Sequence, residues 1–238
     1  MKPYQQVPIQ DCGESLVAIP LHQFAAEQPH PYVKLGAPYG ERSPYYLRQG
    51  VLERLLQAQH FLQIEYPNWR IQIFDAYRPI AVQQFMVNYT LAQRVQARGL
   101  HLPELTETQR REFLEEVYKF WAVPSLNPAM PPPHSTGAAI DVTLIDENGE
   151  AIAMGSPIDE MSPRSYPDYF SDAPSTCIFH GNRQTLKQAM TQAEFQQHPK
   201  EWWHYSYGDQ LWAWLGNQAH SGGTLTARYG RVEENQCL

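Results

Sequence analysis

The sequence is poor in cysteine, has no excess of positive charge and lacks any long hydrophobic run. Its three cysteines, Cys12, Cys177 and Cys237, are isolated and form no Cys-x-x-Cys pair, so we expect reduced thiols rather than a disulfide framework. No local motif supports a nucleophilic Cys–His–Asp arrangement. Lysine and arginine number 18 against 25 acidic residues, and the formal charge of −7 offers no basic surface to nucleic acid or an anionic membrane.

Segments that direct a chain to a membrane are also missing. No stretch approaches the ~18 apolar residues of a membrane span. Residues 1–11 contain no apolar run of the kind that a signal peptide needs. These absences predict a soluble, cytoplasmic protein that binds neither membrane nor nucleic acid, and they leave the oligomeric state open.

Apolar and aromatic side chains, in contrast, are plentiful. Hydrophobic residues make up 42% of the chain, with 6 Trp, 14 Tyr and 9 Phe, which is typical of a folded globular protein. No repeat, low-complexity tract or composition shift divides the 238 residues. We therefore expect one domain over 1–238, with an irregular segment at 1–44 and a C-terminal extension at 209–238.

The spacing of apolar residues predicts a mixture of helices and strands. Helical stripes cover 46–66, a segment from Pro79 to Gly99, a segment from a Thr106–Gln109 capping box through Trp121, and 182–195. Strand-like patterns cover 70–75, 138–145 and 202–207. Because these elements do not alternate regularly as βαβ units, we expect an α+β fold rather than a doubly wound α/β sheet.

Two distant motifs together indicate a catalytic metal site. They are His134-Ser-Thr-Gly-Ala-Ala-Ile-Asp141 and Glu201-Trp-Trp-His204. Ligation by His134, Asp141 and His204 would leave the fourth position of a tetrahedral Zn²⁺ open, which distinguishes catalytic from structural zinc. Glu201 would then be free to act as a general base, and the adjacent tryptophans would keep the site dry.

The strand pattern places Asp141 on a small, polar face. In a strand over 138–144, Asp141 alternates with Ile140 and Val142, whose face is suited to the core. Gly137 would let the chain turn sharply, so that His134 points back toward Asp141.

Arg78, in Asp75-Ala-Tyr-Arg78-Pro79, is a candidate for stabilising a developing oxyanion beside the metal. Taken alone, each motif has an ordinary structural explanation, such as a surface ion pair or a buried aromatic patch. Their coincidence in one chain favours the metal site.

In order and character, these motifs resemble those of the VanX-type D-alanyl-D-alanine dipeptidases, zinc D,D-peptidases that share a fold with the Hedgehog signalling domain. The similarity runs from about Tyr32 to Gly208 and includes the segments 154–165, 181–183 and 201–205. It implies a central antiparallel sheet flanked by helices.

The resemblance also implies roles for individual residues. One zinc per chain would be held by His134, Asp141 and His204, with Glu201 as the catalytic base and Arg78 as the transition-state stabiliser. Asp159 would bind the free ammonium group of a small dipeptide, and Tyr32 would line the substrate pocket. The implied reaction is hydrolysis of D-alanyl-D-alanine, or a related D,D-dipeptide, in cell-wall precursor metabolism.

The chain departs from the family just before its first metal histidine. Pro132 and Pro133 stand where the family usually has serines that help to position the substrate. Proline offers neither a hydroxyl nor a backbone N–H, so recognition of the substrate carboxylate must use other groups. The sequence does not specify which dipeptide is preferred or what the physiological role is. It is also compatible with Fe²⁺, Co²⁺ or Ni²⁺ in place of Zn²⁺.

Two alternative functions are compatible with the same motifs. A D,D-carboxypeptidase acting on peptidoglycan stem peptides would need an export signal and an open groove. The missing signal argues against it, as does Asp159, which suits a substrate with a free N-terminus. A non-catalytic, Hedgehog-like zinc-binding module would not require Glu201 and Arg78, yet both are present.

Overall fold

The computed structural model describes residues 2–172, 177–219 and 224–232, and a five-stranded sheet forms its centre. The strand order is β2 (Ala25–Ala26), β4 (Arg70–Asp75), β5 (Ala139–Ile145), β7 (His204–Ser206) and β6 (Gln196–Gln197). Neighbouring strands are antiparallel, except that the edge strand β2 runs parallel to β4. The predicted α+β fold with a largely antiparallel central sheet is confirmed.

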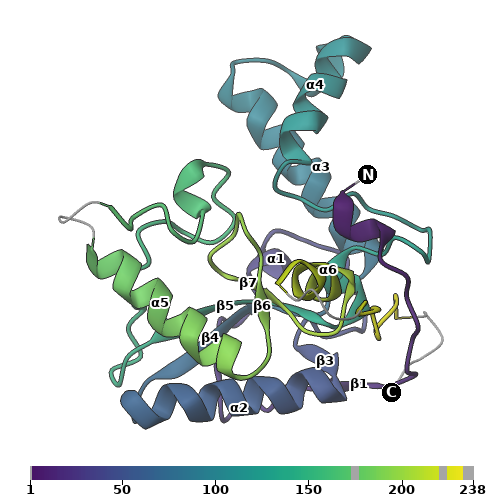
Figure 1. The fold of residues 1–238 in the computed structure, drawn as a ribbon. Coiled ribbons are helices and arrows are strands. Elements are labelled where there is room, and N and C mark those ends of the chain that lie inside the picture. Colours follow the sequence, from purple (N-terminus) through teal and green to yellow (C-terminus); the bar gives the residue numbers. More distant parts are fainter. Residues whose placement is uncertain (1, 173–176, 220–223, 233–238) are drawn as a thin grey trace.

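The main core lies between this sheet and two long helices, α2 (Gln49–Glu65) and α5 (Cys177–Gln192). Figure 1 shows these helices on the same side of the sheet, where they contact each other. The apolar face of β5, formed by Ile140, Val142 and Leu144, is fully buried in this core. Successive side chains of a strand point to opposite faces of the sheet, so Asp141 lies on the face of β5 that points away from this core.

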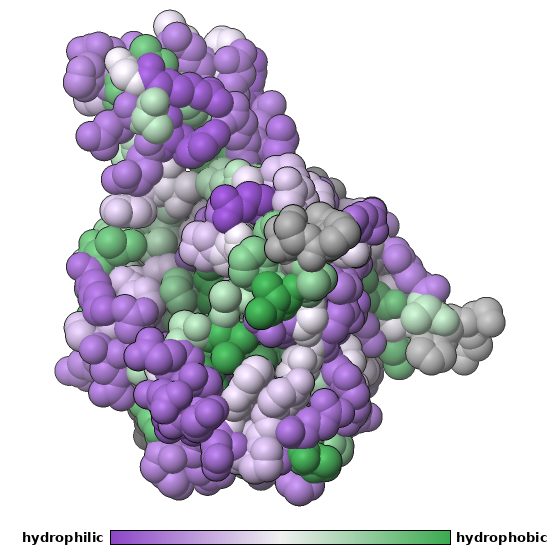
Figure 2. Space-filling model, turned by 90° about the vertical axis from the view of Figure 1, so that its left-hand side faces the viewer, coloured by the Kyte–Doolittle hydropathy of each residue, from purple (hydrophilic) through white to green (hydrophobic). Residues whose placement is uncertain are grey.

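A second apolar cluster joins α3 (Ile80–Ala97) to α4 (Glu107–Val117), with α1 (Pro31–Lys34) at its base. The end of this helical pair projects from the body (Figure 1), and its outer surface is mostly hydrophilic (Figure 2). Tyr32 and Trp121 belong to this cluster. Since both rings also pack on Arg78, the cluster supports one side of the site.

The N-terminal and C-terminal parts of the chain lie against each other. The short helix η1 (Pro3–Gln6) packs on α6 (Gln210–Ala219). The Gln210 amide donates to the carbonyls of Gln5, Val7 and Ala129 at 3.3, 2.7 and 3.1 Å. A small antiparallel sheet pairs β1 (Leu16–Ala18) with β3 (Tyr46–Arg48), and the remaining short helices are η2 (Leu102–Glu104), η3 (Pro133–Thr136) and η4 (Pro163–Ser165).

Several predicted boundaries are confirmed and others are wrong. The strand over 70–75 and the Thr106 capping box occur as expected. The helix predicted from residue 46 begins only at Gln49, because residues 46–48 pair with β1. Helix α5 begins before residue 182, at Cys177, and Trp121 lies beyond the end of α4.

Two further findings concern features that the sequence lacks. Within the described ranges, no helix is both long and apolar enough to cross a membrane. Cys12 and Cys177 are free and exposed, as expected, whereas Cys237 lies outside the described residues.

Candidate active site

Three polar side chains form a row across three neighbouring strands. Asp75 at the end of β4 is paired with Asp141 on β5, and Asp141 is paired with His204 on β7. A register shift between Ile73 and Asp75 brings the end of β4 into this row. Directly opposed residues in antiparallel strands point to the same face, so the sheet itself gathers these three groups.

His134 joins the row from the short helix η3, which ends at Thr136 and is capped by Gly137. Gly137 has a φ of 70°, and a Cβ there would lie 2.4 Å from Cδ2 of Leu16. Glycine is therefore required both by the left-handed backbone and by the close packing. The predicted sharp turn is present, and it directs His134 back toward Asp141.

The donor atoms of His134, Asp141 and His204 converge on one point, and all three residues are buried. His134 Nε2 lies 3.2 Å from Asp141 Oδ2 and 3.2 Å from His204 Nδ1, and the latter lies 3.0 Å from Asp141 Oδ1. Tetrahedral bonds of about 2.0–2.2 Å separate ligand atoms by roughly 3.3–3.5 Å. The nitrogen and oxygen donors therefore fit a zinc-sized ion with little movement.

Neighbouring groups orient both imidazoles. His134 Nδ1 lies 2.8 Å from the carbonyl oxygen of Ala76, which can only accept, so Nδ1 carries the proton and Nε2 is left for a metal. On the other ring, His204 Nε2 faces Ser206 Oγ at 3.4 Å, and that hydroxyl donates to Asp209 at 2.9 Å. Such contacts are the usual support of metal-binding histidines.

The electrostatics of the cluster favour an ionised Asp141. Burial alone would raise its pKa, but the positive charge of protonated His134, followed by hydrogen bonds from His134 and His204, holds the pKa of the carboxyl well below its ordinary value. Burial lowers the pKa of His204. Burial would also lower the pKa of His134, but the charge of Asp141 outweighs this effect and raises that pKa. A cation held by these residues would therefore displace a proton from His134, while Asp141 is already ionised.

Arg78 is held rigidly beside these residues. Its guanidinium donates to Asp75 through Nε at 2.8 Å and to the side-chain oxygen of Gln83 through Nη1 at 2.9 Å. Nη2 lies 3.4 Å from Asp141 Oδ2, and the rings of Tyr32 and Trp121 lie 5.0 and 5.1 Å from Cζ. The guanidinium is thereby fixed next to the candidate metal ligand Asp141.

Asp159 lines the same pocket from the loop between β5 and α5. Its φ of 64° is left-handed, an uncommon conformation that aspartate tolerates better than most residues. Burial, followed by the charge of Asp141, raises its pKa to about 7. Tyr32 does not line the pocket, but its hydroxyl donates to Asp159 at 2.8 Å and accepts from Arg78 at 3.3 Å.

Glu201 lies in the turn just before β7. Its carboxylate oxygens are 3.7 Å from His204 Nδ1 and 3.7 Å from His198 Nδ1. Burial, followed by repulsion from Asp141, raises the pKa of Glu201 to about 8. The group therefore has a higher proton affinity than an ordinary carboxylate.

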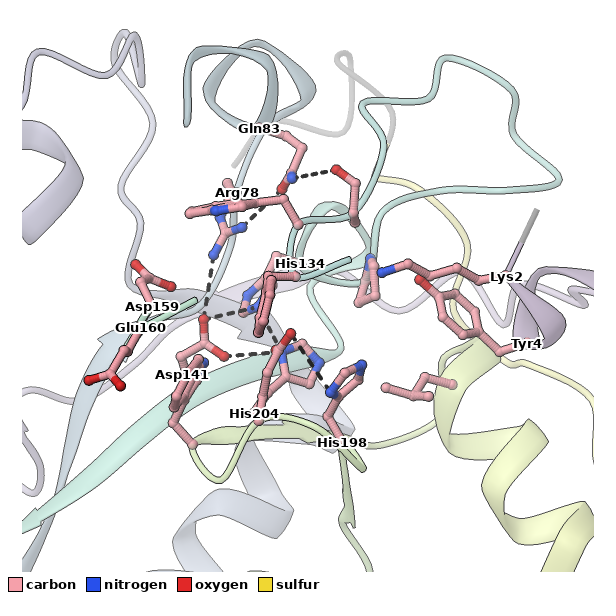
Figure 3. A pocket seen from close by; sticks show the side chains of 17 residues that line it. Lys2, Tyr4, Arg78, Gln83, His134, Asp141, Asp159, Glu160, His198 and His204 are labelled. Atoms are coloured by element: carbon pink, nitrogen blue, oxygen red, sulfur yellow. Dashed lines mark hydrogen bonds and ion pairs between the residues drawn. The ribbon is translucent and has the colours of Figure 1, made fainter. Parts of the chain in front are cut away.

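The predicted site residues other than Tyr32 line one pocket, shown in Figure 3; they are Arg78, His134, Asp141, Asp159, Glu201 and His204. Asp159 and Glu160 lie at one end, and Lys2 and Tyr4 of the N-terminal segment lie at the other. Between them lies the candidate metal-ligand cluster, which consists of His134, Asp141 and His204. Apolar and aromatic side chains complete the wall, among them Trp121, Pro133, Trp203 and Leu211.

Several residues of this site were not predicted from the sequence. The spacing Asp75-x-x-Arg78 at a strand end was a usable signal, because it allows the ion pair seen here at 2.5 Å. No local pattern pointed to Gln83, His198 or Lys2. These three reach the pocket through tertiary packing alone.

The known proteins that this chain resembles in sequence are D-alanyl-D-alanine dipeptidases. The D-ala-D-ala dipeptidase family, Peptidase_M15, matches residues 25–222. A D-alanyl-D-alanine dipeptidase from Synechocystis sp. is 49% identical over 241 residues, which cover 98% of each chain. The enzyme of the same name from Enterococcus faecium is 29% identical over 160 residues, covering 66% of this chain and 71% of that protein.

Among solved structures, this chain is similar to a vancomycin-resistance D,D-pentapeptidase, VanY, in complex with Zn(II). The TM-score is 0.41 and the identity 15%, over 83% of this chain and 92% of that one. With a family match over most of its length and a relative that is 49% identical across nearly the whole chain, this protein belongs to the D-ala-D-ala dipeptidase family, Peptidase_M15.

Proposed function

We propose that this protein is a zinc-dependent dipeptidase that hydrolyses D-alanyl-D-alanine or a related D,D-dipeptide. One zinc ion per chain would be held by His134, Asp141 and His204. The observation that carries the proposal is the convergence of these three donors at the middle of a pocket that Glu201 and Arg78 also line. The name of the 49% identical relative supports the choice of substrate.

When bound, the ion supplies Lewis-acid chemistry, lowering the pKa of a water molecule toward ~7 and polarising a carbonyl. Glu201 accepts the proton from the attacking water and later delivers it to the leaving amine. A raised pKa suits both tasks, because the same carboxyl must take up and release a proton near neutral pH.

Arg78 stabilises the oxyanion that develops on the scissile carbonyl. The side chain stays charged, because Asp75 keeps its pKa high although burial opposes this. Contacts with Asp75, Gln83 and the two flanking rings fix the guanidinium before the substrate arrives. Such preorganised charge costs no reorganisation at the moment of reaction.

Asp159 binds the free ammonium group of the dipeptide. Its carboxyl is buried at one end of the pocket, where an incoming cation would lower its raised pKa and favour the ionised form. Tyr32 contributes from behind the pocket by donating its hydroxyl proton to Asp159. Tyr32 is thus a positioning residue for the ammonium site.

The direct test compares Glu201→Gln and Glu201→Ala with the wild type, each loaded with zinc. Both variants should retain about one zinc per chain and lose turnover of D-alanyl-D-alanine by roughly 10²- to 10⁴-fold. Glu147→Ala, in an exposed turn, is the matched control and should behave as wild type. Undiminished hydrolysis by Glu201→Ala would refute the role of this residue.

A substrate panel separates the proposal from the two alternatives. A dipeptidase releases D-alanine from D-alanyl-D-alanine but not from an acetylated pentapeptide, because Asp159 requires a free ammonium group. Preference for the pentapeptide would instead identify a carboxypeptidase. Zinc binding without hydrolysis of any D,D, L,D or L,L dipeptide would identify a non-catalytic module.

A further inference from the structure

The end of the pocket farthest from Asp159 is lined by the N-terminal segment. Lys2 and the first turn of η1 lie there, and Figure 3 shows the side chains of Lys2 and Tyr4 extending toward the metal-ligand cluster. These two residues place a basic group and a phenol opposite the acidic pair Asp159 and Glu160. The pocket is therefore electrically asymmetric, with carboxyls at one end and an ammonium at the other.

Hydrogen bonds and packing hold the N-terminal segment in place at this end of the pocket. The backbone N–H of Lys2 donates to the Gln5 side chain at 2.8 Å, and the ring of Tyr4 is buried. Beyond them, the Gln210 amide holds the carbonyls of Gln5 and Val7. These contacts fix the position from which the Lys2 side chain enters the pocket.

The Lys2 ammonium lacks an anionic partner among the described residues. The acidic group that influences it most is Glu201, whose contacts at 3.7 Å are with His198 and His204 instead. Burial lowers the pKa of Lys2, and the charge of Glu201 opposes that shift. A partly buried cation without a partner is costly, so an anion that enters the pocket would be bound favourably.

We propose that Lys2 binds the C-terminal carboxylate of the dipeptide substrate. This inference rests on the proposed function and adds the direction in which the substrate lies. Its ammonium faces Asp159, its scissile carbonyl faces the metal ligands and Arg78, and its carboxylate faces Lys2. Tyr4 also lines this end of the pocket.

This arrangement also accounts for the prolines at 132 and 133. Pro133 lines the pocket but has no N–H or hydroxyl with which to bind a carboxylate. Lys2 supplies that missing donor from a different part of the chain. A free carboxylate is therefore the group that this end of the pocket is suited to bind.

The test measures binding of D-alanyl-D-alanine and of its C-terminal amide to zinc-loaded Glu201→Gln, which holds the substrate without rapid turnover. Calorimetry is repeated with Lys2→Met, Lys2→Arg or Lys200→Met added to that background. Lys200 is an exposed neighbour that does not line the pocket, so its substitution controls for the loss of one nearby charge. Zinc content and melting temperature verify that each variant is folded.

Lys2→Met should weaken binding of the dipeptide by roughly 10- to 150-fold, the range for losing a charged hydrogen bond, and leave binding of the amide nearly unchanged. Lys2→Arg should recover most of the loss, and Lys200→Met should match its parent. An equal loss for dipeptide and amide, or no loss for either, would overturn the role of Lys2. If the wild type binds the dipeptide through Lys2 yet hydrolyses nothing, the proposed function fails while this inference stands.

Discussion

Replacing Asp75 by asparagine should be among the most damaging single changes in the described part of the chain. The Asp75 carboxylate is fully buried and lies 2.5 Å from Nη2 and 2.8 Å from Nε of Arg78. It also accepts from Tyr39 at 3.2 Å and lies 3.1 Å from His30 Nε2. Asparagine keeps the shape but removes the charge that balances the buried guanidinium.

The loss in the free energy of unfolding can be estimated from the burial of the Asp75–Arg78 ion pair. Breaking a buried ion pair by removing one partner costs about 3–5 kcal/mol, a large share of the ~5–15 kcal/mol that stabilises a typical protein. Tyr39→Phe removes one neutral hydrogen bond from the same carboxylate and should cost only about 0.5–1.5 kcal/mol. The two variants should thus destabilise the protein at the same carboxylate by clearly different amounts.

Thermal unfolding of the chelator-treated proteins is the assay. For a chain of this size, Asp75→Asn should lower the melting temperature by roughly 6–20 °C at neutral pH. Since the pKa of Asp75 is held below its ordinary 3.8, its stabilising effect is present above that pH and is lost as the pH falls further. The difference between wild type and variant should therefore shrink on acidification. A variant that melts within about 2 °C of the wild type at pH 7 would refute the reasoning.

Two further predictions concern the metal-free protein and the loop that carries Asp159. In the folded protein the pKa of Glu201 is raised from 4.5 to about 8, so metal-free wild type should lose stability as the pH rises between these values, and Glu201→Gln should flatten that dependence in melting curves. A variant with an unchanged pH dependence would contradict the raised pKa. Arg183 donates to the carbonyls of Met154, Arg164 and Tyr166 at 2.7–2.9 Å. Arg183→Met should therefore cost roughly 3 kcal/mol or more in urea unfolding and raise KM for the dipeptide, and an unchanged KM would show that this loop does not position Asp159.

Much of the metal site was predictable because its signals are local. The alternation of Ile140, Asp141 and Val142 identifies both the strand and the face on which Asp141 lies. Gly137 marks the turn that redirects the chain, and its positive φ is a requirement that few other residues meet. These signals depend on the backbone of a few consecutive residues.

The parts that could not be predicted depend on distant contacts. Leu47 carries the same apolar periodicity as the helix that follows it, yet it pairs with Val17 in a strand, because the partner strand decides its conformation. Lys2 carries no pattern at all. Its place in the pocket follows from the packing of η1 on α6, more than 200 residues further along the chain.

The row of Asp75, Asp141 and His204 across three paired strands would make the proposed metal binding depend on strand alignment. If β5 slipped by one residue, Asp141 would turn into the core and Ile140 would take its place at the pocket. Such a misaligned chain could keep its secondary structure but would present no site. Metal uptake during refolding should therefore report correct alignment of the central sheet, and a bound ion would select the correctly aligned chain over its near-native competitors.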